Sequence, residues 1–342
     1  YINQQITDSK EYYVLIDEIQ HLQRFEDALN TLLKNSQLDV YVTGSNARFL
    51  SKDVVTTFRG RGDEVRVHPL SFAEYLSVQQ PLPFAEQHLN EYMRLGGLPQ
   101  LVVMNSEQQK RQYLSQLFAN TYLVDIKERY AIRNDADLEE LIDVIASSIG
   151  SLTNPTKIAN SFASVKQSQL SKDTIKRYLD YMQDAFMIEK AVRYDIKGRK
   201  YIDTPAKYYF EDLGLRNARI NFRQTEPTHL MENLIYNELR VKGYSIDVGQ
   251  VVANTRNANG VSERKQLEVD FVCNKADERI YIQSAYAMPT PEKQEQELKS
   301  LKLINDNFQK VVIAGGMQPT YRNNDGILIL NIYDFLLNKV TI

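Results

Sequence analysis

The chain has 342 residues, enough for two or three compact units if each takes roughly 100 to 200 residues. Its 41 basic and 44 acidic residues give a net charge of -3, which excludes attraction of nucleic acid by an overall positive charge. Any contact with nucleic acid must therefore be local. No stretch approaches the ~20 apolar residues of a membrane span, no signal peptide is recognisable, and the single cysteine, Cys273, excludes an internal disulfide. We therefore expect a cytoplasmic protein without a membrane partner.

Two short apolar runs, residues 12–16 and 38–46, are rich in Val, Ile and Tyr and end in polar or acidic residues, as buried parallel strands do. Between them, apolar residues recur at helical spacing: Leu22, Phe25, Leu29, Leu32 and Leu33. This order predicts a strand, a helix and a second strand, the building block of a parallel sheet with covering helices.

The remaining chain reads as helices followed by a second group of strands. From residue 69 to Gly150 the pattern is helical, with amphipathic segments at 107–130 and 137–149. Next, "NPTKIANSF" and "SKDTIKRYLDYMQDAFMIEKAV" predict two short helices with a turn, followed by a strand through "YYFEDLGL", the order of a winged helix. After Pro227, a helix leads into alternating strands, a helix over 291–304 and a strand at "KVVIAGG".

The segment "YYVLIDEIQ" runs apolar residues straight into two acids, Asp17 and Glu18. In open α/β sheets, ligands gather at the carboxyl ends of the strands. An apolar strand that ends in Asp-Glu fits a Walker B element, in which Asp17 holds Mg²⁺, often through water, and Glu18 polarises the water that attacks the terminal phosphate. The alternative is that both acids only cap the following helix, where an acid is favoured by ~0.3–1 kcal/mol.

The second predicted strand and the loop after it add residue types that suit a phosphate site. The strand ends at Thr43, Ser45 and Asn46, small polar side chains that suit the sensor 1 position of AAA-type ATPases. Arg59 and Arg61 lie in the glycine-containing loop "FRGRGDEV", from which an arginine finger can reach phosphate. Surface charge explains either arginine about as well.

The order of these segments resembles that of prokaryotic AAA-type ATPases of the archaeal-ATPase kind that carry a C-terminal DUF4143 region, over nearly the whole chain. The segments that carry the resemblance are "YYVLIDEIQHLQRFEDALNTLL", "VYVTGSNARFLS", "FRGRGDEVRVHPLSFAEYL", "YMRLGGLPQLV" and "YLVDIKERYAIRN". The resemblance implies a P-loop fold with ATP and Mg²⁺ as cofactors. It assigns Walker B (Asp17 and Glu18), the surroundings of sensor 1 (Ser45 and Asn46) and the arginine finger (Arg59 or Arg61).

We therefore predict an α/β protein in four parts. They are a partial P-loop, AAA-type parallel-sheet domain (1–76), a helical lid region (77–150), a winged-helix-like segment (151–225) and a nuclease-like DUF4143 α/β domain (226–342). One part of the family pattern is missing from these residues, since all fourteen glycines lie outside a G-x-x-x-x-G-K-S/T loop, the Walker A element that cradles phosphate. The sequence is thus interpreted as a fragment without its P-loop, expected to bind ATP weakly or not at all by itself.

The winged-helix-like segment carries candidate DNA-binding residues. Its second helix would be a recognition helix that directs Lys172, Lys176 and Arg177 at phosphate groups. A wing would follow with Arg193, Lys197, Arg199 and Lys200. The alternative is a packing helix with solvated lysines.

The last third holds a second group of carboxylates. Glu232 lies on a predicted helix, and Glu268 and Asp270 share one face of a predicted strand. This arrangement resembles a PD-(D/E)xK nuclease, in which such acids and a Glu-x-Lys build a Mg²⁺ site. Here the Glu-x-Lys positions read Gln283, Ser284 and Ala285, so the sequence predicts a nuclease-like scaffold that has lost its chemistry. The alternative is a sheet whose acids simply face solvent.

Three classes of function stay open. The leading hypothesis is an ATP-dependent motor or switch that acts on or binds DNA. The second is a non-catalytic module that binds DNA or a protein partner, and the third, a nuclease, is disfavoured by Gln283 and Ala285. An arginine finger that acted in trans would further imply a homo-oligomer.

Overall fold

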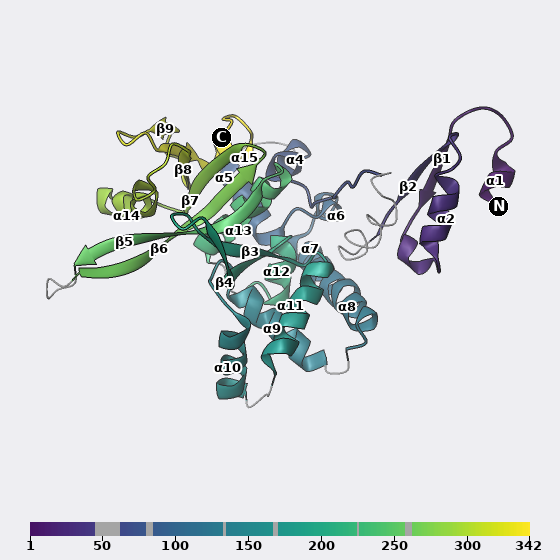
Figure 1. Cartoon of the computed structure of the whole chain (residues 1–342), viewed down its shortest axis with the longest axis horizontal. Coiled ribbons are helices and arrows are strands. Elements are labelled where there is room, and N and C mark those ends of the chain that lie inside the picture. Colours follow the sequence, from purple (N-terminus) through teal and green to yellow (C-terminus); the bar gives the residue numbers. More distant parts are fainter. Residues whose placement is uncertain (45–61, 80–84, 133–134, 167–169, 224–225, 257–261) are drawn as a thin grey trace.

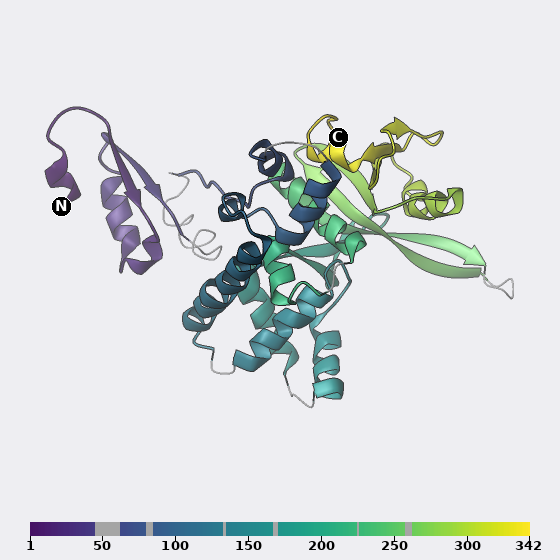
Figure 2. The same ribbon diagram turned by 180° about the vertical axis from the view of Figure 1, so that it is seen from behind.

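The computed structural model describes residues 1–44, 62–79, 85–132, 135–166, 170–223, 226–256 and 262–342 (Figure 1). They form a small α/β unit at the amino end, a group of helices, and a large mixed sheet with helices on both faces. Figures 1 and 2 show the amino-terminal unit to one side of the rest. None of the helices described is long and apolar enough to cross a membrane.

The amino-terminal unit contains two parallel strands and the helices between them. After the short helix α1 (Ile2–Gln5) come β1 (Tyr12–Ile16), the 3-10 turn η1 (Ile19–His21), α2 (Phe25–Leu32) and β2 (Leu38–Val42). The apolar stripe of α2 packs with Ile19 against one face of both strands, because its side chains recur at helical spacing. The predicted strand, helix and strand are confirmed.

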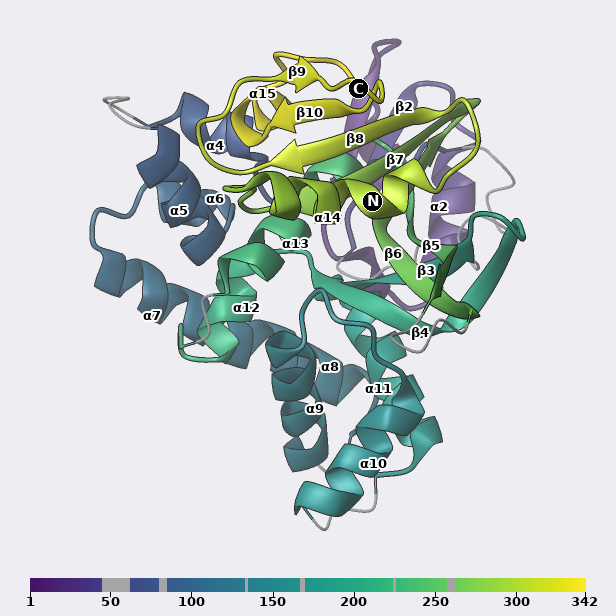
Figure 3. The same ribbon diagram turned by 90° about the vertical axis from the view of Figure 1, so that its left-hand side faces the viewer.

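Helices fill the middle of the chain, and many of them share one apolar core. They are α4 (Phe72–Ser77), α5 (Ala85–Leu95), α6 (Pro99–Val102), α7 (Glu107–Leu117), α8 (Val124–Arg129), α9 (Asp135–Ser147), α10 (Pro155–Lys166), α11 (Lys172–Asp184) and α12 (Leu213–Arg219). A π-helical turn, η3 (Phe118–Leu123), joins α7 to α8, so the amphipathic helix predicted over 107–130 is confirmed as a nearly unbroken one. In Figure 3, α9, α10 and α11 lie together at one end of the molecule.

The strand predicted through "YYFEDLGL" is wrong in its second half. Strand β4 ends at Phe210, and α12 begins directly after Asp212. The Asp212 carboxylate accepts a hydrogen bond from the Leu215 backbone N–H at 2.9 Å, which caps the helix. The apolar run therefore continues as a buried helix because an acidic N-cap interrupts the strand.

The large sheet has eight strands in the order β4-β3-β5-β6-β7-β8-β10-β9. Their bounds are β3 (Ile188–Asp195), β4 (Lys200–Phe210), β5 (Ser245–Arg256), β6 (Ser262–Lys275), β7 (Glu278–Ala285), β8 (Gln309–Ala314), β9 (Tyr321–Arg322) and β10 (Leu328–Asn331). Pairing is mixed: β7, β8 and β10 run parallel, whereas β5, β6 and β7 are antiparallel neighbours. In Figure 2, β5 and β6 extend beyond the other strands as a two-stranded ribbon.

Helices cover both faces of this sheet. Helix α13 (Pro227–Val241) and α15 (Ile332–Leu336) pack on one face, with Leu234 and Phe335 fully buried. Helix α14 (Pro291–Lys302) packs on the other face through Leu298 and Leu301. A mixed α/β fold is therefore observed, as predicted, with the helix, strands, helix and strand of the last third in the expected order.

Helices α4 and α5 belong to the core of the large sheet. Phe72 of α4 and Tyr92 of α5 are buried in the same cluster as Leu230 and Leu234 of α13. The first backbone N–H of α4, on Phe72, donates to the buried Glu238 carboxylate of α13 at 2.7 Å. Helix α4 lies at the end of the part predicted as the AAA-type domain (1–76). It therefore packs on the large sheet and its helices, which we call the carboxyl-terminal body.

A group of charged residues, which we call the Arg66 cluster, links the segment just before α4 to the carboxyl-terminal body. It consists of Arg66, His68, Glu189, Glu211 and Arg240. The Arg66 guanidinium contacts the carboxylates of Glu189, at 2.5 Å, and of Glu211, and it also lies over the Phe186 ring. All five side chains are largely buried, so these ion pairs are weakly screened by solvent.

The "LGGLP" segment has a packing role. Gly96 adopts a φ of +78°, and a Cβ on Gly97 would overlap the Leu70 carbonyl oxygen. The Gly97 N–H donates to the buried Asp212 carboxylate at 2.8 Å. Burial raises the pKa of Asp212 to about 6, although the backbone N–H donors oppose this shift. The two glycines thus let the turn after α5 approach the start of α12.

Candidate functional site

Asp17 and Thr43 lie side by side at the carboxyl edge of the first unit. Each directly follows its strand, and β1 and β2 are parallel, so both strand ends face the same edge. The Thr43 hydroxyl donates to the Asp17 carboxylate and accepts a hydrogen bond from the Glu18 N–H at 3.0 Å. Backbone bonds from Thr43 N–H to Ile16 and from Ile19 N–H to Thr43 fix this arrangement. An exposed carboxylate is thereby held in one position.

The helix-capping alternative finds no side-chain capping hydrogen bond at η1 or α2. Glu18 is the N-cap of η1, but its side chain makes no capping hydrogen bond, and its backbone is left-handed with a φ of 48°. Helix α2 has Arg24 as its N-cap, also without a side-chain cap. Asp17 is bonded to Thr43 of the neighbouring strand instead.

The other residues predicted for the phosphate site, Ser45, Asn46, Arg59 and Arg61, lie outside the described residues. Their part in the site stays a prediction. The described oxygen ligands are the Asp17 carboxylate and the Thr43 hydroxyl. Both suit Mg²⁺, which is usually held by one or two carboxylates plus the phosphates of its substrate. Across the described ranges there is no group of three or more His, Cys, Asp or Glu that could hold a metal ion alone.

Three carboxylates of the last third surround one lysine, a group that we call the Lys207 cluster. The Lys207 Nζ of β4 lies 2.7 Å from Glu232 of α13, 2.6 Å from Glu268 and 3.6 Å from Asp270 of β6. The side chains of Lys207, Glu232 and Asp270 are 3%, 8% and 9% exposed, whereas Glu268 is 35% exposed. The alternative of solvent-facing acids therefore does not hold for the two buried ones.

Further hydrogen bonds hold the Lys207 cluster. The Tyr209 hydroxyl donates to Glu232 at 2.7 Å, and the Ser284 N–H donates to Asp270 at 2.8 Å. Burial alone would lower the pKa of Lys207, but the surrounding carboxylates raise it overall. Burial and Glu232 raise the pKa of Asp270, and Lys207 opposes this shift. The lysine is thus the charged cation of the group.

Gln283, the fourth residue predicted for the nuclease-like site, is turned away from these carboxylates. Its side-chain oxygen accepts from the Asp270 N–H and from the Ser300 hydroxyl of α14, both at 3.4 Å. The structure therefore brings the three acids together but places Lys207 among them. Sequence reasoning missed this residue, although a lone lysine inside the apolar run "PAKYYF" was a usable signal.

The candidate DNA-binding residues lie on α11 and on the turn after β3. Lys172, Lys176 and Arg177 are exposed on α11, the helix that follows α10 in the chain. Arg199 and Lys200 are exposed where β3 turns into β4. The end of β3, from Arg193, pairs in parallel with β5, so the hairpin is part of the large sheet. A free wing is therefore not confirmed.

Comparisons with known proteins agree with the character of the first unit. Residues 1–76 match the family model of an AAA domain, and residues 86–226 match a domain of unknown function, DUF8612. An uncharacterized protein of Haemophilus influenzae is 35% identical over 340 residues, which cover 98% of this chain and 80% of that protein. The chain belongs to the same family as this protein. Its first 76 residues are of AAA type, as the resemblance implied.

Further members and neighbours are more distant. The uncharacterized protein MJ1544 of Methanocaldococcus jannaschii is 27% identical over 312 residues, which cover 86% of this chain and 67% of that protein. The crystal structure of protein VC1899 from Vibrio cholerae aligns with 96% of this chain and 90% of its own, at 13% identity and a TM-score of 0.24, too low to support a common fold. The predicted DUF4143 region is not confirmed, since the model that matches the middle of the chain is DUF8612.

Proposed function

We propose that this protein is an AAA-type ATPase in which Asp17 and Glu18 form the acidic edge of the Mg·ATP site. The observation that carries this proposal is the hydrogen bond from Thr43 to Asp17, which joins the ends of two neighbouring parallel strands. Ligands of open α/β sheets bind at this edge. The match of residues 1–76 to an AAA domain supports the same function.

Each residue of the edge has a separate role in the proposal. Thr43 holds one oxygen of Asp17 and leaves the other carboxylate oxygen for a water of hydrated Mg²⁺. Glu18 follows Asp17 and would take a proton from the attacking water. Bound Mg²⁺ would neutralise the charge on the phosphate groups. The proposal assigns no residue to the cradling of the phosphates.

The test is ATP hydrolysis by the protein and three variants. Asp17→Asn keeps an oxygen for Thr43 but removes the charge, so we expect Mg²⁺-dependent hydrolysis to fall at least 100-fold. Glu18→Gln should give a similar loss. Glu11→Gln, an exposed acid just before the amino end of β1, is the matched control and should leave the rate unchanged. Equal rates in all four proteins would contradict the proposal.

A second candidate function, binding of duplex DNA, rests on the exposed basic residues of α11 and of the turn between β3 and β4. Arg177, Arg199 and Lys200 lie on α11 and the neighbouring turn, where they can contact phosphate groups. Replacing all three by alanine should weaken duplex binding and reduce the slope of log K against log salt by about 2 to 3. A charge-matched control replaces three lysines that are exposed elsewhere, Lys34, Lys299 and Lys339, by alanine. An unchanged slope would remove this function.

A further inference from the structure

Strands β5 and β6 continue beyond the rest of the large sheet as a two-stranded ribbon (Figures 1 and 2). Strand β3 pairs with β5 only as far as Gln250, and β7 pairs with β6 only from Phe271 onward. Among the described strands, residues 251–256 and 262–270 therefore pair only with each other. We call these two segments the ribbon. It projects from the carboxyl-terminal body as a separate arm.

The two faces of the ribbon have different surroundings. On one face, Val251 is 4% exposed and packs in the core under α14. On the other face, which we call the outer face, Asn254 lies opposite Arg264, and Val252 lies opposite Gln266. Val252 is 40% exposed, and the three polar side chains are exposed as well. The outer face is thus open to a partner.

The polar side chains of the outer face are not used within the described part of the chain. There, the side chains of Asn254, Arg264 and Gln266 form no hydrogen bond or ion pair with another residue. Toward the sheet, the same face continues with Glu268, whose carboxylate is compensated by Lys207 at 2.6 Å. The outer face therefore offers one guanidinium and two amide groups without a competing free acid.

These residue types and the shape of the ribbon suit the major groove of duplex DNA. An arginine side chain binds the edge of guanine through two hydrogen bonds, and an asparagine or glutamine side chain does the same with adenine. The groove is about 12 Å wide and admits a two-stranded ribbon, whose strands lie about 4.8 Å apart. A polypeptide that paired with the edge of the ribbon would use backbone groups and would not need these side chains. The outer face therefore favours base edges as its partner.

The basic turn between β3 and β4 lies beside the base of the ribbon. Asp195, at the end of β3, pairs with Gln250, and the exposed Arg199 and Lys200 follow in the chain. Four residues of strand, about 13 Å, separate Gln250 from Asn254. This length is close to the width of the major groove, about 12 Å. With the ribbon in the groove, both basic side chains can therefore contact phosphate groups at the border of the groove.

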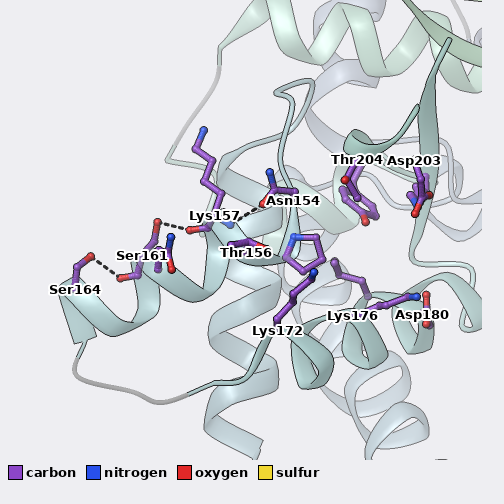
Figure 4. A pocket seen from close by; sticks show the side chains of 15 residues that line it. Asn154, Thr156, Lys157, Ser161, Ser164, Lys172, Lys176, Asp180, Asp203 and Thr204 are labelled. Carbon is purple, nitrogen blue, oxygen red and sulfur yellow. Dashed lines mark hydrogen bonds and ion pairs between the residues drawn. The ribbon is translucent and has the colours of Figure 1, made fainter. Parts of the chain in front are cut away.

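The pocket between α10, α11 and strands β3 and β4 is a less suitable binding site. Its volume is about 830 Å³, and lysines line it (Figure 4). Figure 4 shows Lys157 and Lys172 directed apart and Lys176 beside Asp180. Charges arranged in this way do not converge on one small anion. They suit separate phosphate groups of a nucleic-acid backbone.

We propose that the outer face of the ribbon reads base edges in the major groove of duplex DNA through Asn254, Arg264 and Gln266. This inference rests on the second candidate function, in which the basic residues of α11 and of the turn between β3 and β4 contact phosphate groups. Phosphate contacts supply affinity that does not depend on sequence, whereas contacts to base edges supply the sequence preference. The two contributions can therefore be measured separately.

The experiment begins with selection of tight binders by the full chain from a pool of duplexes of random sequence. Fluorescence anisotropy at several salt concentrations then compares the enriched duplex, a scrambled duplex of the same composition and an RNA duplex of the enriched sequence. The RNA is included because the major groove of A-form RNA is too narrow for side chains to read.

Three variants separate the contributions. The ribbon variant replaces Asn254, Arg264 and Gln266 by alanine. Its matched control is Lys265→Ala, an exposed cation of the same ribbon that alternates to the opposite face. The third is the triple alanine variant of α11 and the turn, which tests the phosphate contacts. All replaced side chains are exposed, so the fold should persist, and the melting temperature checks this.

We expect the unchanged protein to bind the enriched duplex at least tenfold more tightly than the scrambled duplex and the RNA. The ribbon variant should lose most of this preference while the slope of log K against log salt stays the same, and Lys265→Ala should keep the preference. The variant of α11 and the turn should lose affinity for both DNA duplexes alike.

Several results would overturn the proposal. Salt-dependent binding without any sequence preference, or a preference that survives in the ribbon variant, would refute the ribbon alone, whereas absence of duplex binding would refute the second candidate function as well. An equal loss for both DNA duplexes in the ribbon variant, with a reduced salt slope, would make the ribbon a phosphate contact only. A changed molar mass of the ribbon variant in light scattering would make the ribbon an interface between copies of this chain instead.

Discussion

The Lys207 cluster allows a stability prediction with a defined pH dependence. Replacing Lys207 by methionine keeps the length of the side chain but leaves two buried carboxylates, Glu232 and Asp270, without their cation. Breaking a buried ion pair by removal of one partner costs about 3–5 kcal/mol. Glu268 is about one-third exposed, so solvent screens its contact and it adds little. We therefore expect a loss of about 3–5 kcal/mol at pH 8.

The loss should shrink at lower pH. In Lys207→Met the buried carboxylates can become neutral only by taking up protons, so their folded pKa lies above the unfolded values of about 4. The folded state then binds more protons than the unfolded state, and the stability of the variant falls as pH rises from 5 to 8. In the unchanged protein burial already raises the pKa of Asp270, but Lys207 limits that shift.

Denaturant unfolding followed by circular dichroism at pH 5 and pH 8 measures both effects. Lys200→Met, at the exposed start of the same strand, is the matched control and should change stability by less than about 0.5 kcal/mol. Adding Glu232→Gln and Asp270→Asn to Lys207→Met should restore much of the stability, because no unpaired charge is then buried. An unchanged free energy of unfolding, or an equal loss at both pH values, would refute the assignment of Lys207 as the cation of this group.

Three further predictions concern other parts of the chain. Plasmid DNA incubated with the protein and Mg²⁺ should stay intact, because a lysine lies among the three acids and Gln283 points away; cleavage that disappears in Asp270→Ala would contradict this. Arg66→Ala should lower the free energy of unfolding by roughly 2 kcal/mol, since it removes charge-assisted bonds of the Arg66 cluster, and a change below the error of denaturant unfolding would show that the cluster is not stabilising. Because burial raises the folded pKa of Asp212 to about 6 from 3.8, stability should fall as pH rises through this window, and Asp212→Asn should flatten that slope in thermal unfolding.

The sequence predicts elements better than it predicts which residues meet. The strands and helix of the first unit follow from local periodicity, since each apolar stripe indicates its own buried face. The same holds for α13 and α14, which were expected at their observed positions. By contrast, "YYFEDLGL" looks like one apolar run until Asp212 is recognised as a helix cap.

The candidate sites show the same limit. Asp17 could be placed at a strand end, and the structure adds its bond to Thr43, which depends on the pairing of two strands 26 residues apart. The contact of Lys207 with three carboxylates could not be predicted from residue spacing, because its partners lie on a helix and on a strand much later in the chain. The pairing of β3 with β5 also could not be read locally, since strand neighbours are set by the whole sheet.

The measurement that tests the central account most directly is ATP binding and single-turnover hydrolysis by the protein with Glu18→Gln. The account predicts that this variant binds Mg·ATP about as well as the unchanged protein but hydrolyses it at least 100-fold more slowly, because only the proton acceptor is lost. Hydrolysis at the unchanged rate would contradict the assignment of Asp17 and Glu18 as the acidic edge of an ATPase site.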